Sequence, residues 1–284
     1  MADGVPTNAR IAIIAGGGSL PEAVVEHLTV HKRLFDVIAL EGEAKAGFGD
    51  MRFSIGNVEG ILHALERLGT THVVLVGWVR RRPTLRDSRV GHRAIRALLP
   101  LLAALGKGDD AILREAIGAI ERRGVHVIGV QDIWPELVAE DATLTVRKPT
   151  RAELDAARHG LDAAHAIGAF DTGQALVTFG KRIVALEGAE GTDGMLDRVA
   201  RLRDEGRIRV NAGTGILVKA CKPNQETRVD LPSIGPETVQ SVERAALAGI
   251  IIEAGRSLIL DRQRTIQAAN DASVFIRGLA RNGV

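Results

Sequence analysis

The first half of the chain alternates short apolar runs with stretches of helical periodicity, and this alternation limits the possible folds more than any other feature. Apolar runs at 11–16, 35–40, 71–78 and 125–130 have the length of β-strands. Strands alternating with helices predict parallel βαβ units, because a parallel pair needs a long crossover connection. We therefore expect a doubly wound, Rossmann-like α/β domain over residues 1–132. The expected helices begin at Leu20 and cover 58–68, 88–105 and 109–123.

The pattern changes at residues 133–149, where two prolines interrupt any sustained periodicity. We interpret this stretch as a linker and expect a second domain over residues 150–284. Thr150 followed by Glu153 is the pattern of a capping box that starts a helix. Two apolar runs on either side of Gly180 predict a hairpin, so the C-terminal domain is expected to be α/β with a partly antiparallel sheet. Its strand-like runs are 174–180, 182–188, 215–221, 249–255 and 257–261.

Bulk composition excludes several classes of protein. The formal net charge is +2, aromatic residues make up 3% of the chain and there is no tyrosine, so nucleic-acid binding is not expected. A single cysteine, Cys221, excludes an intramolecular disulfide and agrees with a reducing cytoplasm. The first ten residues lack the pattern of a signal peptide, and no apolar run has the roughly 18 residues of a membrane span. Binding to a membrane surface stays open.

A glycine-rich stretch follows the first expected strand, where a dinucleotide-binding fold has its phosphate loop. Pro21 occupies the place of the third glycine in that fold's fingerprint, so NAD and FAD are not expected. Ser19 and Glu22 have capping-box spacing, which explains a tight turn into a helix. Bare backbone N–H groups beside a helix start would also suit a phosphate or carboxylate. The candidates for this contact are Gly16, Gly17, Gly18, Ser19 and Leu20.

Two further stretches of the expected N-terminal domain carry charge. The sequence "GWVRRRP" places three arginines after the third expected strand, and at least one of them is expected to face a phosphate; Arg82 is our candidate. The adjacent acids Asp109 and Asp110 open a helix. One of them can cap that helix, and ribose, base or metal contacts remain the alternative.

The densest chemistry lies in "LEGAEGTDGMLDR", where Glu187, Glu190 and Asp193 are spaced by three and separated by glycines. Asp193 or Thr192 can cap the following helix, which needs only one such residue. Like charges this close raise one another's pKa unless a cation lies between them. Mg²⁺ suits carboxylate oxygens, whereas Arg198 could instead neutralise one acid.

A second polar cluster occupies residues 219–235. Lys219, Lys222 and Arg228 are typical phosphate donors, and its polar and acidic members could position water or bind metal. A solvated loop is the simpler interpretation, but polar loops at a scaffold edge often carry function. Cys221 has no histidine near it in sequence to activate it as a nucleophile. The polar and acidic members are Gln225, Glu226 and Asp230.

Five motifs occur in order within a similarity that runs from about residue 10 to about residue 280: "IAGGGSLP", "GWVRRRP", "KGDDAILR", "LEGAEGTDGMLDR" and "KPNQETRVDLPSIG". Together they resemble the UDP-2,3-diacylglucosamine pyrophosphatases of Gram-negative bacteria that lack the metallophosphoesterase for the same step. The resemblance implies two domains joined by a linker, with the lipid product bound between them and a divalent metal, normally Mg²⁺, needed for activity. The implied reaction converts UDP-2,3-diacylglucosamine to UMP and 2,3-diacylglucosamine 1-phosphate (lipid X) in lipid A biosynthesis, by attack of water on the β-phosphorus.

The resemblance also implies roles for residues. Asp230 matches the family's essential aspartate, with position 226, where relatives often carry Asp, as the alternative. Lys222 and Arg228 would hold the phosphoryl oxygens. The expected substrate contacts are the glycine stretch, Arg82, Asp109, Asp110, Thr192 and Gln225. The expected metal ligands are Glu187, Glu190, Asp193 and Asp230.

Two acyl chains tie such a substrate to a bilayer, so we expect a cytoplasmic protein peripherally associated with the inner membrane. A homodimer is a further possibility. The rival interpretation is a nucleotide- or metabolite-binding sensor on the Rossmann-like fold, which would have no need of three clustered carboxylates.

Overall fold

The computed structural model describes residues 5–80, 109–208 and 213–281. The chain forms two compact units: unit 1 contains Met1–Pro135 with Glu226–Asp230, and unit 2 contains Glu136–Gln225 with Leu231–Val284. The expected helix over 88–105 and the candidate Arg82 lie outside the described residues. None of the helices in the described part of the chain combines the length and apolarity needed to cross a membrane.

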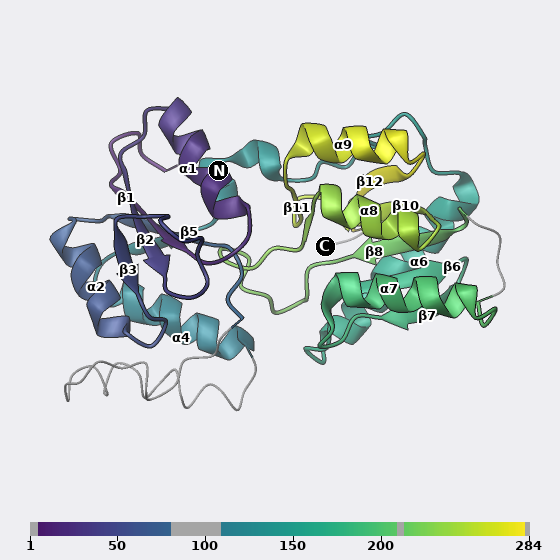
Figure 1. Ribbon diagram of the computed structural model, residues 1–284, viewed down its shortest axis with the longest axis horizontal. Helices are drawn as coiled ribbons and strands as arrows, with labels where there is room; N and C mark the ends of the chain where they lie inside the picture. The colour runs from purple at the N-terminus through teal and green to yellow at the C-terminus, as the bar shows by residue number, and fades with distance from the viewer. Residues whose placement is uncertain (1–4, 81–108, 209–212, 282–284) are drawn as a thin grey trace. The chain divides into compact units, whose positions relative to one another are not determined.

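Unit 1 is built on a parallel sheet with the strand order β3-β2-β1-β4-β5. All residues of the central strand β1 are buried, which requires cover on both faces of the sheet. Ala12 and Ile14 face the helices α2 and α4, and the alternating residues of β1 face the other side. The doubly wound, Rossmann-like architecture is therefore confirmed (Figure 1). Its elements are β1 (Ile11–Ala15), α1 (Leu20–Val30), β2 (Phe35–Leu40), β3 (Met51–Phe53), α2 (Val58–Arg67), β4 (His72–Val76), α4 (Asp109–Glu121), β5 (His126–Ile128) and α5 (Val130–Ile133).

Unit 2 contains a mixed sheet with the strand order β12-β10-β8-β6-β7. Strands β8, β10 and β12 are parallel, and β6 is antiparallel to both β8 and β7, which confirms the partly antiparallel sheet and the hairpin at Gly180. A short parallel pair, β9 with β11, lies apart from this sheet. The elements are α6 (Arg151–Gly168), β6 (Ala175–Phe179), β7 (Arg182–Leu186), α7 (Gly191–Asp204), β8 (Gly215–Lys219), β9 (Ser233–Ile234), α8 (Pro236–Arg244), β10 (Leu247–Glu253), β11 (Leu258–Ile259), α9 (Arg262–Asp271) and β12 (Phe275–Leu279).

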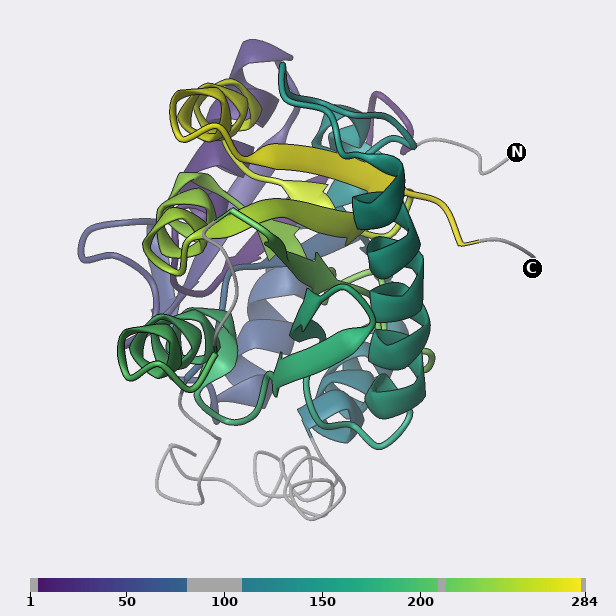
Figure 2. The same ribbon diagram turned by 90° about the vertical axis from the view of Figure 1, so that its right-hand side faces the viewer.

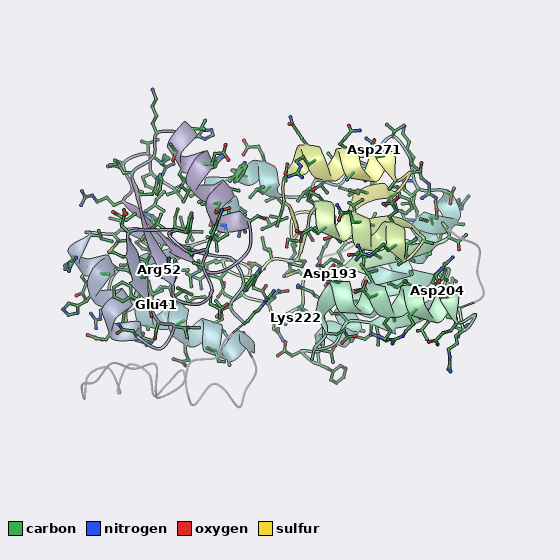
Figure 3. All side chains as sticks on the ribbon, in the orientation of Figure 1. Glu41, Arg52, Asp193, Asp204, Lys222 and Asp271 are labelled. Atoms are coloured by element: carbon green, nitrogen blue, oxygen red, sulfur yellow. The ribbon has the colours of Figure 1, made fainter. Side chains whose placement is uncertain are left out.

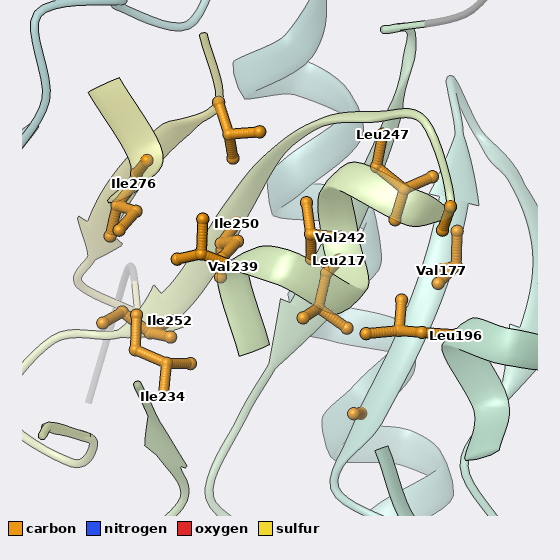
Figure 4. Close-up of a cluster of buried hydrophobic side chains, with 14 of the residues drawn as sticks. Val177, Leu196, Leu217, Ile234, Val239, Val242, Leu247, Ile250, Ile252 and Ile276 are labelled. Atoms are coloured by element: carbon orange, nitrogen blue, oxygen red, sulfur yellow. The ribbon is translucent and has the colours of Figure 1, made fainter. Parts of the chain in front are cut away.

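Helices cover both faces of the sheet of unit 2. Figure 2 shows α6 on one face and α7, α8 and α9 side by side on the other. Leu196, Val239 and Val242 from α7 and α8 pack against Leu217 and Ile250 of the sheet in the main core (Figure 4). The helical spacing of apolar residues therefore buries one stripe of each helix.

Capping differs between two helices for which the sequence predicts a capping box. Thr150 Oγ1 accepts from the Glu153 amide at 3.3 Å and Glu153 Oε2 accepts from the Thr150 amide at 2.7 Å, so this box is confirmed. Ser19 makes no capping hydrogen bond, because its backbone has helical angles (φ −87°, ψ −19°) instead of the extended ones that aim a cap side chain inward. Glu22 instead pairs with Lys45 at 2.6 Å, so the second predicted box is wrong.

Three features of the fold differ from expectation. Strands β3, β9 and β12 were not predicted; β3 and β9 are too short to show a period, and Arg277 and Gly278 interrupt the apolar run of β12. Most of the expected linker 133–149 belongs to unit 2, where the Leu144 amide donates to Ile276 O at 2.9 Å. The segment Glu226–Asp230, expected in the C-terminal domain, belongs to unit 1, because Val229 packs against the core of that unit.

Candidate active site

The glycine turn, residues 16–19, follows β1 at the point where the strand order of unit 1 reverses. The Gly16 amide donates to Val76 O and the Gly17 amide to Trp78 O, both at 2.8 Å. A Cβ atom at Gly17 would lie 2.5 Å from the Trp78 ring. Two of the three glycine amides are therefore used within the chain, and Trp78 explains the need for glycine at position 17. Ligand binding by Gly16, Gly17, Gly18, Ser19 and Leu20 stays a prediction.

Arg80 lies beside this turn. Its guanidinium carbon is 4.0 Å from the centroid of the Trp78 ring, and its backbone amide donates to Glu43 Oε2 at 3.1 Å. This cation–π contact orients Arg80 at the carboxyl edge of the sheet. Asp109 and Asp110 form the first residues of α4, as the sequence predicts for a helix start.

Arg228 holds the segment 226–230 within unit 1. Its Nε and Nη2 atoms donate to the two carboxylate oxygens of Glu226, each at 2.8 Å, and Nη1 donates to Glu121 at 2.6 Å. Hydrogen bonding to Arg228 lowers the pKa of Glu226, and the two carboxylates raise the pKa of Arg228. The guanidinium therefore links the segment to α4, and contact with a phosphoryl group remains a prediction.

Asp230, the expected essential aspartate, ends the same segment. It is half-buried, and its backbone amide donates to Glu226 O at 3.0 Å. The turn closed by this bond sets the direction of the chain at Asp230. The remaining expected metal ligands belong to unit 2.

The acidic turn, residues 187–193, gives each carboxylate a different partner. Glu187 accepts from the Gln174 amide and from Thr192 Oγ1, both at 2.8 Å. Asp193 Oδ1 accepts from Ser241 Oγ at 3.1 Å. Glu190, at the N-cap position of α7, accepts from Arg198 at 2.7 Å, the internal pair that the sequence left open.

These contacts show whether Thr192 or Asp193 caps α7 and whether the carboxylates of the acidic turn can share a cation. Neither Thr192 nor Asp193 caps α7, because both lie inside its first turn. Hydrogen bonds from its own backbone and from Arg198 lower the pKa of Glu190. Among the described residues no three Asp, Glu, His or Cys side chains are grouped so that they could hold a metal ion. As arranged, the acidic turn does not fit a shared Mg²⁺ ion.

The Lys222 turn, residues 221–225, follows the central strand of unit 2. Lys222 is labelled in Figure 3. Its Nζ donates to Asp171 Oδ1 at 2.7 Å, and its backbone amide donates to Gln225 Oε1 at 2.8 Å. Gln225 Nε2 donates in turn to Gln174 Oε1 at 3.2 Å. Because the Gln174 amide binds Glu187, hydrogen bonds run from the Lys222 turn to the acidic turn. The structure thus joins four sequence-predicted site residues, namely Lys222, Gln225, Glu187 and Thr192.

Buried polar groups lie beneath this turn. Glu253, at the end of β10, is 2% exposed and accepts from the Cys221 amide at 2.9 Å. His165 on α6 is also buried, and its Nε2 lies 3.4 Å from Glu253 Oε2. Burial lowers the pKa of His165, and the charge of Glu253 partly offsets this effect. Lys219 is buried as well and donates to Ser233 O at 2.9 Å.

Sequence reasoning missed Glu253, Gln174 and His165. Glu253 carried the clearest signal, since it is an acid at the end of an otherwise apolar strand, where a buried charge is costly. Gln174 and His165 have no such signal, because each becomes significant only through a contact with a residue distant in sequence.

Fold and site together define a two-unit α/β protein whose polar side chains gather at sheet ends, the usual place for small-molecule sites in such folds. Residues 10–137 match the model of the LpxI N-terminal domain, and residues 140–277 match that of the LpxI C-terminal domain. The chain is 37% identical over 273 residues to the UDP-2,3-diacylglucosamine pyrophosphatase LpxI of Caulobacter vibrioides, covering 95% of this chain and 97% of that protein. The chain therefore belongs to the LpxI family, and the resemblance seen in its motifs is confirmed.

A solved structure is similar only at a low level. The UDP-glucose 4-epimerase of Thermus thermophilus, solved in complex with NAD, is 15% identical and has a TM-score of 0.30, with 97% of this chain and 88% of that chain covered. A likeness this weak carries no inference about the present protein.

Proposed function

We propose that this protein is a hydrolase that cleaves the pyrophosphate bond of UDP-2,3-diacylglucosamine in lipid A biosynthesis. The observation that carries the proposal is the 37% identity to a UDP-2,3-diacylglucosamine pyrophosphatase, which extends over nearly the full length of both chains. The reaction releases UMP and 2,3-diacylglucosamine 1-phosphate (lipid X), and water attacks the β-phosphorus.

Positioning and electrostatics supply most of the catalysis, because phosphoryl transfer leaves little covalent work to a protein. Lys222 binds the phosphoryl oxygens. Its ammonium now pairs with Asp171, whose side chain is 46% exposed, so an anionic substrate can compete for the same donor. Gln225 holds the backbone of Lys222 and thereby supports this contact. Asp230 serves as the essential carboxylate, and Arg228 keeps the segment that carries it in place.

Dependence on Mg²⁺ or another divalent cation is part of the proposal, on the strength of the family resemblance alone. The carboxylates of the acidic turn already have separate partners, so in this arrangement they do not form a ligand set for such an ion. Activity is expected to disappear in excess EDTA and to return on addition of MgCl₂. Full activity in EDTA would remove the metal from the proposal.

The substrate also implies contact with a membrane. Each buried CH₂ of an acyl chain stabilises the bilayer-bound state by about 0.8 kcal/mol, so the substrate stays in the inner leaflet of the cytoplasmic membrane. The enzyme associates with that surface peripherally. Sedimentation with anionic vesicles at low salt tests this part; protein that stays entirely in the supernatant contradicts it. A homodimer stays a prediction.

Hydrolysis in ¹⁸O-labelled water tests both whether the reaction occurs and which phosphorus the water attacks. The purified protein is incubated with UDP-2,3-diacylglucosamine, and both products are analysed by mass spectrometry. Label in the sugar phosphate is expected. Label in UMP overturns attack at the β-phosphorus. Tight UMP binding with no turnover favours the rival interpretation, a nucleotide- or metabolite-binding sensor.

A further inference from the structure

The Lys222 turn is held in place by hydrogen bonds to its own backbone amides. The Cys221 amide donates to Glu253 Oε2 at 2.9 Å, and the Lys222 amide donates to Gln225 Oε1 at 2.8 Å. The Gln225 amide donates back to Lys222 O at 3.1 Å, which closes the turn. Two successive amides are thus fixed by side chains, and the direction in which the Lys222 side chain leaves the backbone is fixed with them.

Glu253 is the first of two residues that anchor the Lys222 turn, and burial of its carboxylate is energetically costly. It ends a seven-residue strand in which every residue is buried, and its side chain is 3% exposed. Its basic neighbours are His165 at 3.4 Å and Arg256 at 3.9 Å, and Arg256 is partly exposed. A buried carboxylate stabilises the fold poorly unless hydrogen bonds and charges compensate it, so packing alone does not explain an acid here.

Gln174 is the second anchor. Its Oε1 accepts from Gln225 Nε2, its backbone O accepts from the Ala220 amide at 2.9 Å, and its backbone amide donates to Glu187. Gln225 is 7% exposed, so the loss of the Gln174 acceptor would remove a hydrogen bond from a buried amide group. One residue therefore ties the Lys222 turn both to the end of β8 and to the acidic turn.

We infer that Glu253 and Gln174 are positioning residues that hold the Lys222 ammonium where it meets the pyrophosphate of the substrate. The inference rests on the proposed function, in which Lys222 binds phosphoryl oxygens. A displacement of about 1 Å at a group that contacts the reacting atoms can cost about 100-fold in rate. The two anchors therefore affect catalysis through Lys222, without touching the substrate.

Steady-state kinetics with UDP-2,3-diacylglucosamine test the inference. Glu253→Ala and Gln174→Ala each remove an acceptor and are expected to lower kcat about 10- to 100-fold, with a smaller change in KM. Glu253→Gln and Gln174→Glu keep an acceptor at the same place and are expected to recover most of the loss. Thr178→Val is the matched control, because this residue is fully buried at the far end of β6 and bonds Gly180 O. Its kcat should stay within about twofold.

A double-mutant cycle distinguishes an effect that acts through the position of Lys222 from a general disturbance of the structure. In a Lys222→Ala background, Glu253→Ala and Gln174→Ala should cost less than about twofold further, because the group that they position is already absent. The same fold-loss with and without Lys222 would overturn the inference. So would a loss in Thr178→Val as large as that in the anchor variants.

Hydrogen exchange of the peptide 220–226 gives a readout independent of activity. The amide of Cys221 should exchange at least about 10-fold faster in Glu253→Ala than in the wild type, because its acceptor is gone. Unchanged exchange overturns the inference whatever the kinetics show. An inactive wild type with the expected exchange would instead place the failure in the proposed function.

Discussion

The glycine turn of unit 1 and the Lys222 turn of unit 2 occupy equivalent places, since each follows the central strand of a five-stranded sheet. Different interactions determine the conformations of the two turns. The glycine turn is determined by sterics: Trp78 lies so close that a Cβ atom at Gly17 cannot fit. The Lys222 turn is determined by polar contacts, with Glu253 and Gln225 almost fully buried.

This difference shows which kind of evidence points to function. Three consecutive glycines attract attention in a sequence, yet a packing contact accounts for the one at position 17. Buried polar side chains are less visible, but each carries a desolvation cost that must be compensated. A neutral amide could provide much of the same packing as Glu253. A polar group buried at that cost is the stronger indication of a functional site.

The largest expected effect extends the comparison to Asp230, which follows the Lys222 turn but belongs to unit 1. Asp230→Ala should lower kcat by about 10³-fold or more, the size of effect typical of an essential acid or base. The fold should survive, because Asp230 is only half-buried. Turnover is measured by UMP release, and far-UV circular dichroism checks folding. Most of wild-type turnover in a folded variant would remove Asp230 from the mechanism.

Gly17→Ala tests the steric side of the comparison. The added methyl group meets the rigid Trp78 ring and should lower the free energy of unfolding by about 2 kcal/mol, as overpacking does elsewhere. Urea titration followed by tryptophan fluorescence measures this effect, because the two tryptophans, Trp78 and Trp134, both belong to unit 1.

The control for Gly17→Ala is the same change in a Trp78→Ala background, where Trp134 still reports unfolding. With the ring absent, the methyl group should cost little. An equal cost in both backgrounds would show that Trp78 is not the reason for glycine. A raised KM with unchanged stability would instead indicate a phosphate contact.

Arg228→Ala is expected to have a smaller effect on stability, about 1 kcal/mol, because its side chain is 36% exposed and solvent screens its ion pairs. Activity should fall about 10-fold, since the segment that carries Asp230 loses its link to α4. Arg123→Ala is a matched control, because Arg123 also bridges two carboxylates of unit 1, Glu59 and Glu66. An equal loss of activity in both variants contradicts a specific role for Arg228.

The ion pair between Arg228 and Glu226 predicts that the free energy of unfolding depends on pH. Arg228 lowers the pKa of Glu226, so the stability that this pair contributes is present above the ordinary value of 4.5 and is lost as pH falls below it. Wild-type protein should therefore lose more stability below pH 4.5 than Arg228→Ala does. Parallel curves from urea titrations at several pH values would contradict this prediction.

The smallest expected effect concerns His165 beneath the Lys222 turn. Its lowered pKa means that the unfolded chain binds a proton more readily, so the free energy of unfolding should fall as pH drops below 6.5. One proton can contribute at most about 1.4 kcal/mol per pH unit. His165→Asn should flatten this slope in urea titrations followed by circular dichroism, whereas His159→Asn, an exposed change on the same helix, should not. Equal slopes would contradict the prediction.

Local patterns determined much of the fold. The alternation of apolar and helical stretches predicted the parallel sheet of unit 1, and the runs on either side of Gly180 predicted the hairpin of unit 2. These predictions succeeded because periodicity within ten or fifteen residues specifies how an element buries its apolar face. Short strands such as β3 and β9 were missed because two or three residues contain no period.

The sequence alone also located the motifs of the site and the family to which they belong. It could not determine which side chains would meet. The carboxylates of the acidic turn are neighbours along the chain, but the fold gives Glu187, Glu190 and Asp193 separate partners. The anchors of the Lys222 turn come from residues 174 and 253, which only the order β10-β8-β6 brings beside it. Local sequence sets each element, and sheet order decides the contacts between elements, because hydrogen bonds depend on distances across the sheet and not along the chain.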